Sequence, residues 1–233
     1  MRHRSLVLIA LAALAFAPGL RAQDTRPGIA VMPFQNGGSY GQDKENFEAL
    51  ERGLAGMLIS ELAQNPGARV VERENVQSLI GEQDLGKDGR LDAATAAKVG
   101  KLVGARYMVM GSFVDLYGHF RVDARLVDVE TSEIIKVVRG DPKYEKREEM
   151  FKLLQSVAER LMAETKLPPL TAEVSRAVKA RNVPTEALTY YSRALLYQDR
   201  GDKTKAAEFF SKAVDIFPDY SEAKAGLQRV RGG

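Results

Sequence analysis

Apolar residues follow a strand pattern near residue 30 and then a helical pattern. Residues 29–32 form a short apolar run closed by Pro33, which predicts a buried strand. Between residues 47 and 62 apolar positions recur every three or four residues, which predicts a helix that ends before residues 65–67. Gly53 and Gly56 interrupt this helix, and each costs about 1 kcal/mol of helix propensity. We expect both glycines to let the helix lie close to a sheet.

A second strand and helix follow, and then a helix that is rich in small residues. Residues 69–72 favour a strand and residues 74–83 a helix. Asp92 is placed to cap a helix over residues 93–103, and Gly104 to end it in the left-handed conformation. One face of this helix carries small side chains, which predicts close packing on a sheet. The residues of that face are Ala96, Val99, Gly100 and Val103.

Strand patterns return in the middle of the chain. Residues 107–114 are mostly apolar, as in a central strand, whereas residues 120–126 alternate between apolar and charged positions. After a turn the chain returns as a strand over residues 134–138, and Asp141-Pro142 predicts the start of a long helix. The core positions of that helix are Met150, Leu154, Val157 and Leu161. The pattern predicts an α/β domain over residues 23–166, with a mixed sheet flanked by helices.

Residues 167–169, Leu-Pro-Pro, predict a domain boundary. Residues 167–184 are expected to form a linker with a short helix at 171–180. The rest of the chain is helical in pattern: Thr185 is placed to cap a helix that runs to Arg200. The next helix is expected to run to Phe217, before Pro218, and the last helix to span residues 221–230.

The segment that begins at residue 187 and includes Pro218 resembles a tetratricopeptide repeat of 34 residues. With Pro218 as the closing proline, Ala187 is the first residue of the repeat, and Arg193 is the one clear departure, because leucine is usual there. The landmark positions that fit are Tyr190, Ala194, Tyr197, Gly201, Ala206, Phe210 and Ala213. The resemblance implies a small all-α module over residues 185–233, with one repeat and a capping helix.

A single repeat cannot bury its apolar face alone, so its first helix offers candidate partner-binding residues. These are Leu188, Tyr191, Leu195 and Gln198. Two alternatives stay open: the helices at 171–180 and 221–230 cover the apolar side chains, or these side chains line a groove for a partner. Such repeats use a basic clamp for a C-terminal carboxylate, but here Tyr191 and Leu195 occupy its positions. A bound segment would therefore be apolar or helical.

Residues 1–22 have the pattern of a secretory signal peptide. Arg2 and Arg4 precede an unbroken apolar run of 12 residues, and residues 20–22 suit a cleavage site. Such a run spans about 18 Å as a helix, less than the bilayer core of about 30 Å. We expect cleavage near Ala22, no transmembrane segment in the mature chain, and a periplasmic protein that is soluble or peripheral to the outer membrane.

Charge and cysteine content restrict the function classes. The chain has 34 basic and 31 acidic residues, a net charge of +3, and the signal peptide holds three of the basic residues and no acidic one. The remaining balance of 31 to 31 removes the support for a nucleic-acid partner. The chain contains no cysteine, which excludes disulfides, thiol nucleophiles and thiolate metal sites.

The candidate chemical sites have simpler explanations. Residues 84–89 resemble the start of a calcium loop, but the twelfth position is Thr95 instead of glutamate, so we interpret them as a solvated turn. The Gly-rich residues 37–41 match no nucleotide-binding fingerprint and are interpreted as a connecting loop. His119 is the one histidine outside the signal peptide and is interpreted as a turn residue. We predict no catalytic, cofactor or metal site, and a protein that is not an enzyme.

An ordered set of patterns over residues 28–165 resembles the CsgG-like family of bacterial cell-envelope proteins, the curli production assembly/transport component-like family. The patterns lie at residues 29–34, 70–73, 100–112 and 125–134. In pore members of the family, the resemblance implies a lipid-modified cysteine and two hairpins extended into the membrane. Here the cysteine is missing and the corresponding connections are only a few residues long. A secretion pore is therefore not expected.

These features lead to a hypothesis of an exported interaction or assembly factor. Its partners would be envelope proteins, such as components of outer-membrane assembly or secretion. The alternative is a regulator that docks on an envelope enzyme such as a cell-wall synthase, because accessory lipoproteins of those enzymes look similar in fold. The oligomeric state is left open, with a homo-oligomer among the alternatives.

Overall fold

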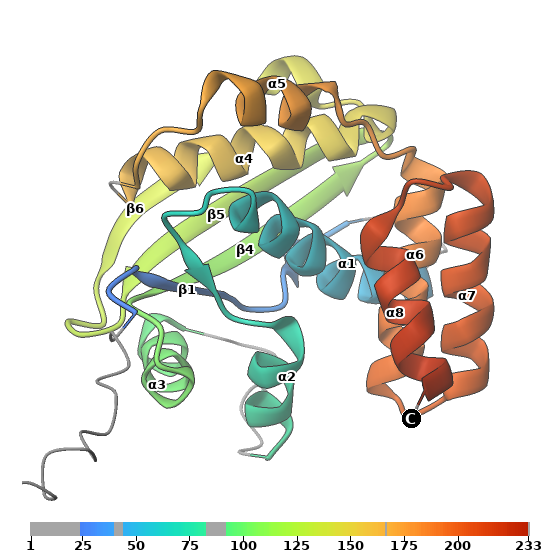
Figure 1. The fold of residues 1–233 in the computed structure, drawn as a ribbon, viewed down its shortest axis with the longest axis horizontal. Coiled ribbons are helices and arrows are strands. Elements are labelled where there is room, and N and C mark those ends of the chain that lie inside the picture. Colours follow the sequence, from blue (N-terminus) through green and yellow to red (C-terminus); the bar gives the residue numbers. More distant parts are fainter. Residues whose placement is uncertain (1–23, 40–43, 83–91, 166, 233) are drawn as a thin grey trace, which may run out of the picture.

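The computed structural model describes residues 24–39, 44–82, 92–165 and 167–232, which form a sheet layer and a helical module (Figure 1). The strands are β1 (Gly28–Val31), β2 (Gln35–Asn36), β3 (Arg69–Val70), β4 (Tyr107–Leu116), β5 (His119–Asp128) and β6 (Ile134–Arg139). Their order in the sheet is β3-β1-β4-β5-β6, with β2 also paired with β4. β1 is parallel to β3 and β4, whereas β5 is antiparallel to β4 and β6. The predicted mixed sheet is confirmed.

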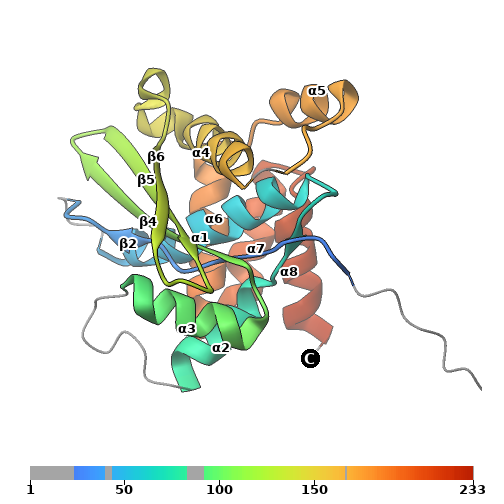
Figure 2. The same cartoon turned by 90° about the vertical axis from the view of Figure 1, so that its left-hand side faces the viewer.

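Helices cover both faces of the sheet (Figure 2). One face packs on α1 (Lys44–Ala63) and α4 (Met150–Glu164), and its core includes Val31, Phe113, Phe120 and Leu126. The other face packs on α2 (Arg73–Glu82) and α3 (Ala93–Val103), and its core includes Ala30, Met32, Met108 and Val127. Successive residues of β1 point to opposite faces and both faces are buried, which explains the unbroken apolar run.

The packing of α3 follows its prediction closely. The Asp92 carboxylate accepts a hydrogen bond from the backbone N–H of Thr95 at 2.8 Å, and Gly104 ends the helix with φ of 67°. A Cβ at Gly100 would lie 2.7 Å from Met108 Cγ on β4, closer than normal van der Waals contact. The small face therefore packs directly on the sheet, as the spacing predicted.

The start of α4 differs from the prediction of a helix from Asp141-Pro142. Residues Pro142–Tyr144 and Arg147–Glu149 form short 3-10 turns, and α4 begins at Met150. The cause is a return of the chain to the sheet, because the N–H of Phe120 donates to the carbonyl of Glu145 at 2.6 Å. Asp141 caps the first short turn instead, accepting from the N–H of Lys143.

The C-terminal helices are α5 (Ala172–Ala180), α6 (Thr185–Asp199), α7 (Lys203–Ile216) and α8 (Ser221–Gly232). α5 lies over α4, and α6 to α8 stand together beside α1 (Figure 1). The prediction that Thr185 caps α6 is wrong: α6 begins at Thr185 after Pro184, and the Thr185 hydroxyl donates to the carbonyls of Arg147 and Glu148 at 3.2 and 3.1 Å. A helical C-terminal part is confirmed.

One hydrophobic core extends across the predicted domain boundary. It contains Leu54 and Leu58 of α1 together with Leu188 and Leu195 of α6. The Leu-Pro-Pro segment is itself tied to the sheet layer, because Asn65 Nδ2 donates to the carbonyl of Pro168 at 2.9 Å. The segment connects two parts that share their interior.

Some predictions concern residues outside the described part of the chain. These are the signal peptide at 1–22, the turn at 84–89 and the last two residues of the Gly-rich loop at 37–41. In the part that is described, no helix combines the length and apolar character needed to cross a membrane.

Candidate functional site at the junction of α1 and α6

The candidate partner-binding residues lie where α6 meets α1, and three of the four are buried. Leu188, Tyr191 and Leu195 expose 0, 6 and 2% of their surface. They do not form an exposed patch, which agrees with the alternative in which other helices cover these side chains. The helices that cover them differ from those expected: α1 and α7 pack on α6, and the rings of Phe210 of α7 and of Tyr220, just before α8, pack on Tyr191.

Two glycines of α1 determine how closely the helices approach. A Cβ at Gly53 would lie 2.6 Å from Ser192 Cβ and closer still to its hydroxyl, and a Cβ at Gly56 would lie 2.7 Å from Tyr191 Oη. Gly53 and Gly56 therefore face α6. This corrects the expectation that they face the sheet, and it shows that α1 is buried on two sides.

Aromatic rings fill the space behind this contact. The ring centroid of Tyr191 lies 5.1 Å from that of Tyr220 and 6.0 Å from that of Phe210. Burial raises the pKa of Tyr191, so its hydroxyl stays protonated. The Tyr220 hydroxyl donates to Met57 Sδ at 2.9 Å, which ties α1 to the start of α8.

A cleft of about 230 Å³ opens beside Tyr191, between α1, α2, α6 and α8. Its walls combine apolar groups with charged ones, and two of the candidate residues, Tyr191 and Leu195, line it. The charged residues of the wall are Glu72, Arg73, Glu74, Glu222 and Arg229. Glu74 is paired with Arg229 at 2.6 Å and Glu222 with Arg181 at 2.6 Å, so ion pairs already occupy these two carboxylates.

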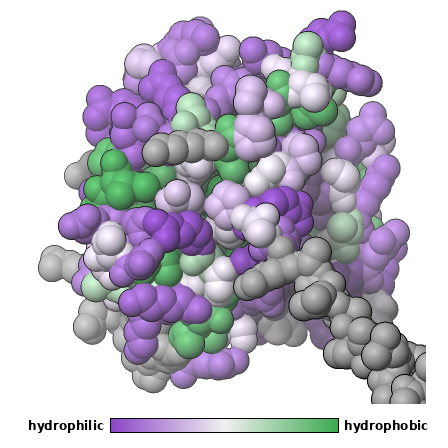
Figure 3. Space-filling view, turned by 60° about the vertical axis from the view of Figure 1, so that its left-hand side comes forward, coloured by the Kyte–Doolittle hydropathy of each residue, from purple (hydrophilic) through white to green (hydrophobic). Residues whose placement is uncertain are grey.

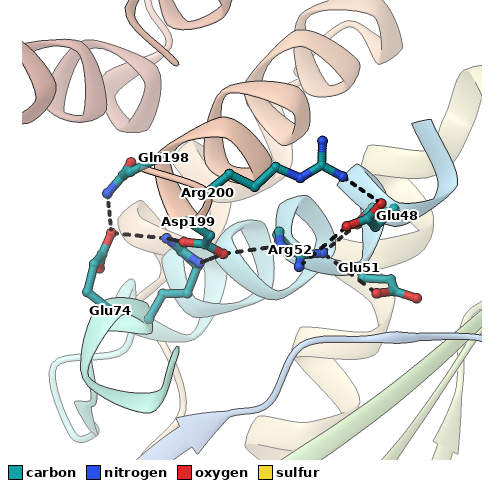
Figure 4. A network of polar contacts seen from close by, with 8 residues as sticks. Glu48, Glu51, Arg52, Glu74, Gln198, Asp199 and Arg200 are labelled. Atoms are coloured by element: carbon teal, nitrogen blue, oxygen red, sulfur yellow. Dashed lines mark hydrogen bonds and ion pairs between the residues drawn. The ribbon is translucent and has the colours of Figure 1, made fainter. Parts of the chain in front are cut away.

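A polar network joins the sheet layer to the end of α6 (Figure 4). Arg73 donates from Nη1 and Nη2 to the two carboxylate oxygens of Asp199 at 3.0 and 2.8 Å, and Arg52 Nε donates to Asp199 at 3.1 Å. The Arg73 and Asp199 side chains are only 7 and 10% exposed, so the pair is largely desolvated. Gln198, the fourth candidate residue, is half-buried at the same end and donates to Glu74 at 3.5 Å.

A second buried cluster lies near the C-terminal end of α1. Arg181, in the segment between α5 and α6, donates to Glu61 at 3.0 Å and through one nitrogen to both oxygens of Glu222 at 2.6 Å. Burial raises the pKa of Glu61 against the charge of Arg181. Burial also acts to raise the pKa of Glu222, but the hydrogen bonds and charge of Arg181 outweigh it, so that pKa is lowered. Arg181 thus stabilises the charged form of Glu222 more than that of Glu61.

The residues of these clusters were not singled out from the sequence, although a signal was present. Glu61 follows Met57 and Leu58 by one turn and so lies on the apolar side of α1, where a charged residue needs a partner. Its partner Arg181 is 120 positions away in the chain, which no local pattern reveals. Among the described residues, no group of three or more histidine or acidic side chains is placed to hold a metal ion.

The junction is therefore a polar and apolar interface that holds the helical module on α1. Buried ion pairs link the two parts, since Arg73 of α2 pairs with Asp199 of α6 and Glu61 of α1 pairs with Arg181. The cleft beside Tyr191 is the hollow that remains between the two parts.

Residues 18–119 match the family model described as Curli production assembly/transport component CsgG. The match includes the described elements from β1 to β4 and the first residue of β5. It supports the CsgG-like resemblance for this segment. A search of curated proteins finds no match.

Solved structures with similar parts include the LpoB C-terminal domain from Salmonella enterica, at 21% identity and a TM-score of 0.35, over 49% of this chain and 81% of that one. LpoB from E. coli gives 21% identity and a TM-score of 0.38, over 49% of this chain and 56% of that one. Lipoprotein GNA1162 from Neisseria meningitidis gives 14% identity and a TM-score of 0.37, over 60% of this chain and 98% of that one. Likenesses at these low TM-scores assign neither a fold nor a role to this chain.

Proposed function

We propose that this chain is an exported, non-enzymatic interaction factor of the bacterial cell envelope that serves an assembly or secretion system. The observation that carries the proposal is the match of residues 18–119 to a family named for curli production, assembly and transport. The apolar run and cleavage pattern of residues 1–22 agree with export to the periplasm.

The helical module, in this proposal, is one tetratricopeptide-type repeat with α8 as its capping helix. Ala194, Ala206, Phe210 and Ala213 are buried between its helices, as the small and aromatic landmarks of such a repeat require. Gly201 takes a φ of 78° at the turn between α6 and α7, where a side chain would be strained. Because α6 packs on α1, the module braces the sheet layer and leaves partner contact to other surfaces.

Expression of the tagged full chain in a Gram-negative host tests the proposal, with a matched chain lacking residues 2–22 as control. The full chain is expected in the periplasmic fraction, with a mature N-terminus near Gln23. Chemical crosslinking in intact cells, followed by mass spectrometry, should join it to outer-membrane assembly or secretion proteins and leave the control without them.

Two other outcomes separate the alternatives. Crosslinks dominated by cell-wall synthases would favour a regulator of an envelope enzyme. A full chain that stays in the cytoplasm with residues 1–22 intact would contradict the proposal as a whole.

A further inference from the structure

The outer edge of β6 is open and apolar. Within the described residues, no strand pairs with β6 on the side away from β5. Ile134, Ile135 and Val137 expose 45, 45 and 58% of their surface, and they are half of the large apolar residues left exposed in the described part. Figure 3 shows this side of the molecule as mostly hydrophilic, with separate apolar patches. Such an edge is a template for pairing with another chain.

The backbone of β6 has groups available for that pairing. The N–H of Gly140 donates to the carbonyl of Val122 at 2.9 Å, so Val138 and Lys136 also bond to β5 by the alternation of an antiparallel ladder. Val137 and Arg139 then direct their backbone groups outward. Arg160 Nη1 already donates to the carbonyl of Arg139 at 2.7 Å, whereas no described residue bonds to the outward N–H and C=O of Val137.

A bulge or a charged residue often protects an edge strand against pairing with another chain. β6 has a register shift and a lysine, but neither covers the residues around Val137. The register shift lies opposite Leu126 and Val127, so the strand is regular from Lys136 to Arg139. The ammonium group of Lys136 pairs with Glu164 of α4 at 2.9 Å, and the next residue, Val137, stays exposed. The protection therefore does not cover the part of the edge that can pair.

The surroundings of the edge carry an excess of positive charge. Arg121 and Arg139 share one carboxylate, that of Asp123, at 2.9 and 3.0 Å. Arg125 is exposed and lies directly opposite Val137 in the register, and no carboxylate of the described residues pairs with it. Its side chain can extend over Val137 toward a further strand, since strands lie about 4.8 Å apart. An added strand with acidic residues would neutralise this excess.

We propose that β6 is a docking edge for an extended, acidic segment of a partner protein. The segment adds an antiparallel strand, with an apolar residue opposite Val137 and an acidic residue opposite Arg139. The proposal deepens the proposed function, on which it rests, by assigning the partner-binding surface. A second copy fits less well, because it would repeat the positive charges, and pairing of six residues buries far less than the roughly 1,200 Å² of a stable interface.

Purified full chain and two labelled peptides test the proposal by fluorescence anisotropy. The first peptide is acetyl-Glu-Thr-Val-Glu-Val-amide, and the second replaces both glutamates with lysine. The acidic peptide should bind below about 1 mM, and the basic peptide about tenfold more weakly or not at all. Val137→Pro should abolish binding, since proline removes the outward N–H without breaking a bond to β5.

A second pair of variants keeps the test decisive if Val137→Pro unfolds. Arg125→Glu breaks no ion pair and should weaken the acidic peptide about tenfold, whereas Lys203→Glu on the remote α7 should change nothing. The proposal fails if both peptides bind alike, if neither binds, or if Arg125→Glu has no effect. A concentration-dependent dimer that Val137→Pro disrupts would overturn it in favour of a second copy. None of these failures affects the export and crosslinking results, so the proposed function is tested separately.

Discussion

Gly53 of α1 and Ser192 of α6 lie against each other so closely that a Cβ on Gly53 would overlap the Ser192 hydroxyl. The hydroxyl turns back along its own helix and donates to the carbonyl of Leu188 at 2.7 Å. Small size on one helix and an internally satisfied hydroxyl on the other allow a near approach without an unpaired polar group. This contact lets α1 and α6 approach closely where the helical module and the sheet layer share a core.

Gly53→Ala should therefore destabilise the protein by about 1–3 kcal/mol through overpacking, although alanine favours helices. Urea unfolding followed by circular dichroism measures the change. The control is Gly81→Ala on α2, where nothing lies within 4 Å and the substitution should be neutral or stabilising by up to about 1 kcal/mol. Ser192→Gly combined with Gly53→Ala should recover part of the loss, and equal effects at both glycines would contradict the contact.

The pair of Arg73 and Asp199 makes a prediction about buried charge. Asp199→Ala leaves the Arg73 guanidinium desolvated, with Glu74 at 3.6 Å as its nearest carboxylate, and should cost about 3 kcal/mol or more. Replacing both residues, Arg73→Met with Asp199→Leu, should restore most of the stability because no charge is left unpaired. A double-mutant cycle in urea measures the coupling.

An exposed pair serves as the control for that cycle. Lys212 and Glu208 lie one turn apart on α7 with both side chains about half exposed, and Lys212→Ala should change stability by less than about 0.5 kcal/mol. If Asp199→Ala cost no more than Lys212→Ala, the network would be a surface feature without influence on the junction.

The buried Glu61 carboxyl predicts that the difference in stability between the wild type and Glu61→Gln depends on pH. Burial raises its pKa in the folded state, so its contribution to stability is full below its unfolded pKa and is lost as the pH rises through the folded pKa. Glu61→Gln removes that loss. The stability of the variant relative to the wild type should therefore rise between pH 4 and pH 8, as measured by urea unfolding at each pH.

The neighbouring carboxylate gives the opposite sign and so a matched control. The pKa of Glu222 is lowered, so its contribution is present above the unfolded pKa and is lost as the pH falls. Glu222→Gln relative to the wild type should become less stable as the pH rises over the same interval. If the relative stability of both variants changed in the same direction with pH, the pKa values of Glu61 and Glu222 would not be shifted in opposite directions.

Local patterns were enough to predict most elements but not how α1 and α6 meet. Apolar runs and alternation predict β1, β4 and β5, and Asp92 with Gly104 predicts both ends of α3, because these signals act within a few residues. Gly53 and Gly56 indicate a close neighbour of α1, but their spacing does not say which element approaches.

Long-range polar pairing was beyond the same reasoning for a physical reason. Arg73 and Asp199 are 126 positions apart, and each alone has the appearance of a solvated charge on a helix end. Their burial follows from the docking of α6 on α1, which no periodicity describes. The cover over Leu188, Tyr191 and Leu195 was hidden for the same reason, because local patterns do not show that the distant helix α1 packs on this face of α6.

The joint replacement of Tyr191 and Leu195 tests whether the two parts of the molecule unfold as one. Removing a buried leucine costs about 2–5 kcal/mol and removing a buried aromatic about 3–5 kcal/mol. The combined loss in Tyr191→Ser with Leu195→Ser should therefore be a large part of the free energy of unfolding, which is about 5–15 kcal/mol for a single domain. Because these side chains pack on α1, whose other side covers the sheet, the loss should reach the sheet layer as well. Ile134→Ser with Val137→Ser removes two apolar residues that are exposed, and should cost less than about 1 kcal/mol in total. Circular dichroism reports the helices during urea unfolding, and hydrogen exchange at β4 reports the sheet. A sheet that keeps its protection in the Tyr191 and Leu195 variant, while the helices melt, would mean that the Leu-Pro-Pro segment separates two independent modules and that the shared core contributes little.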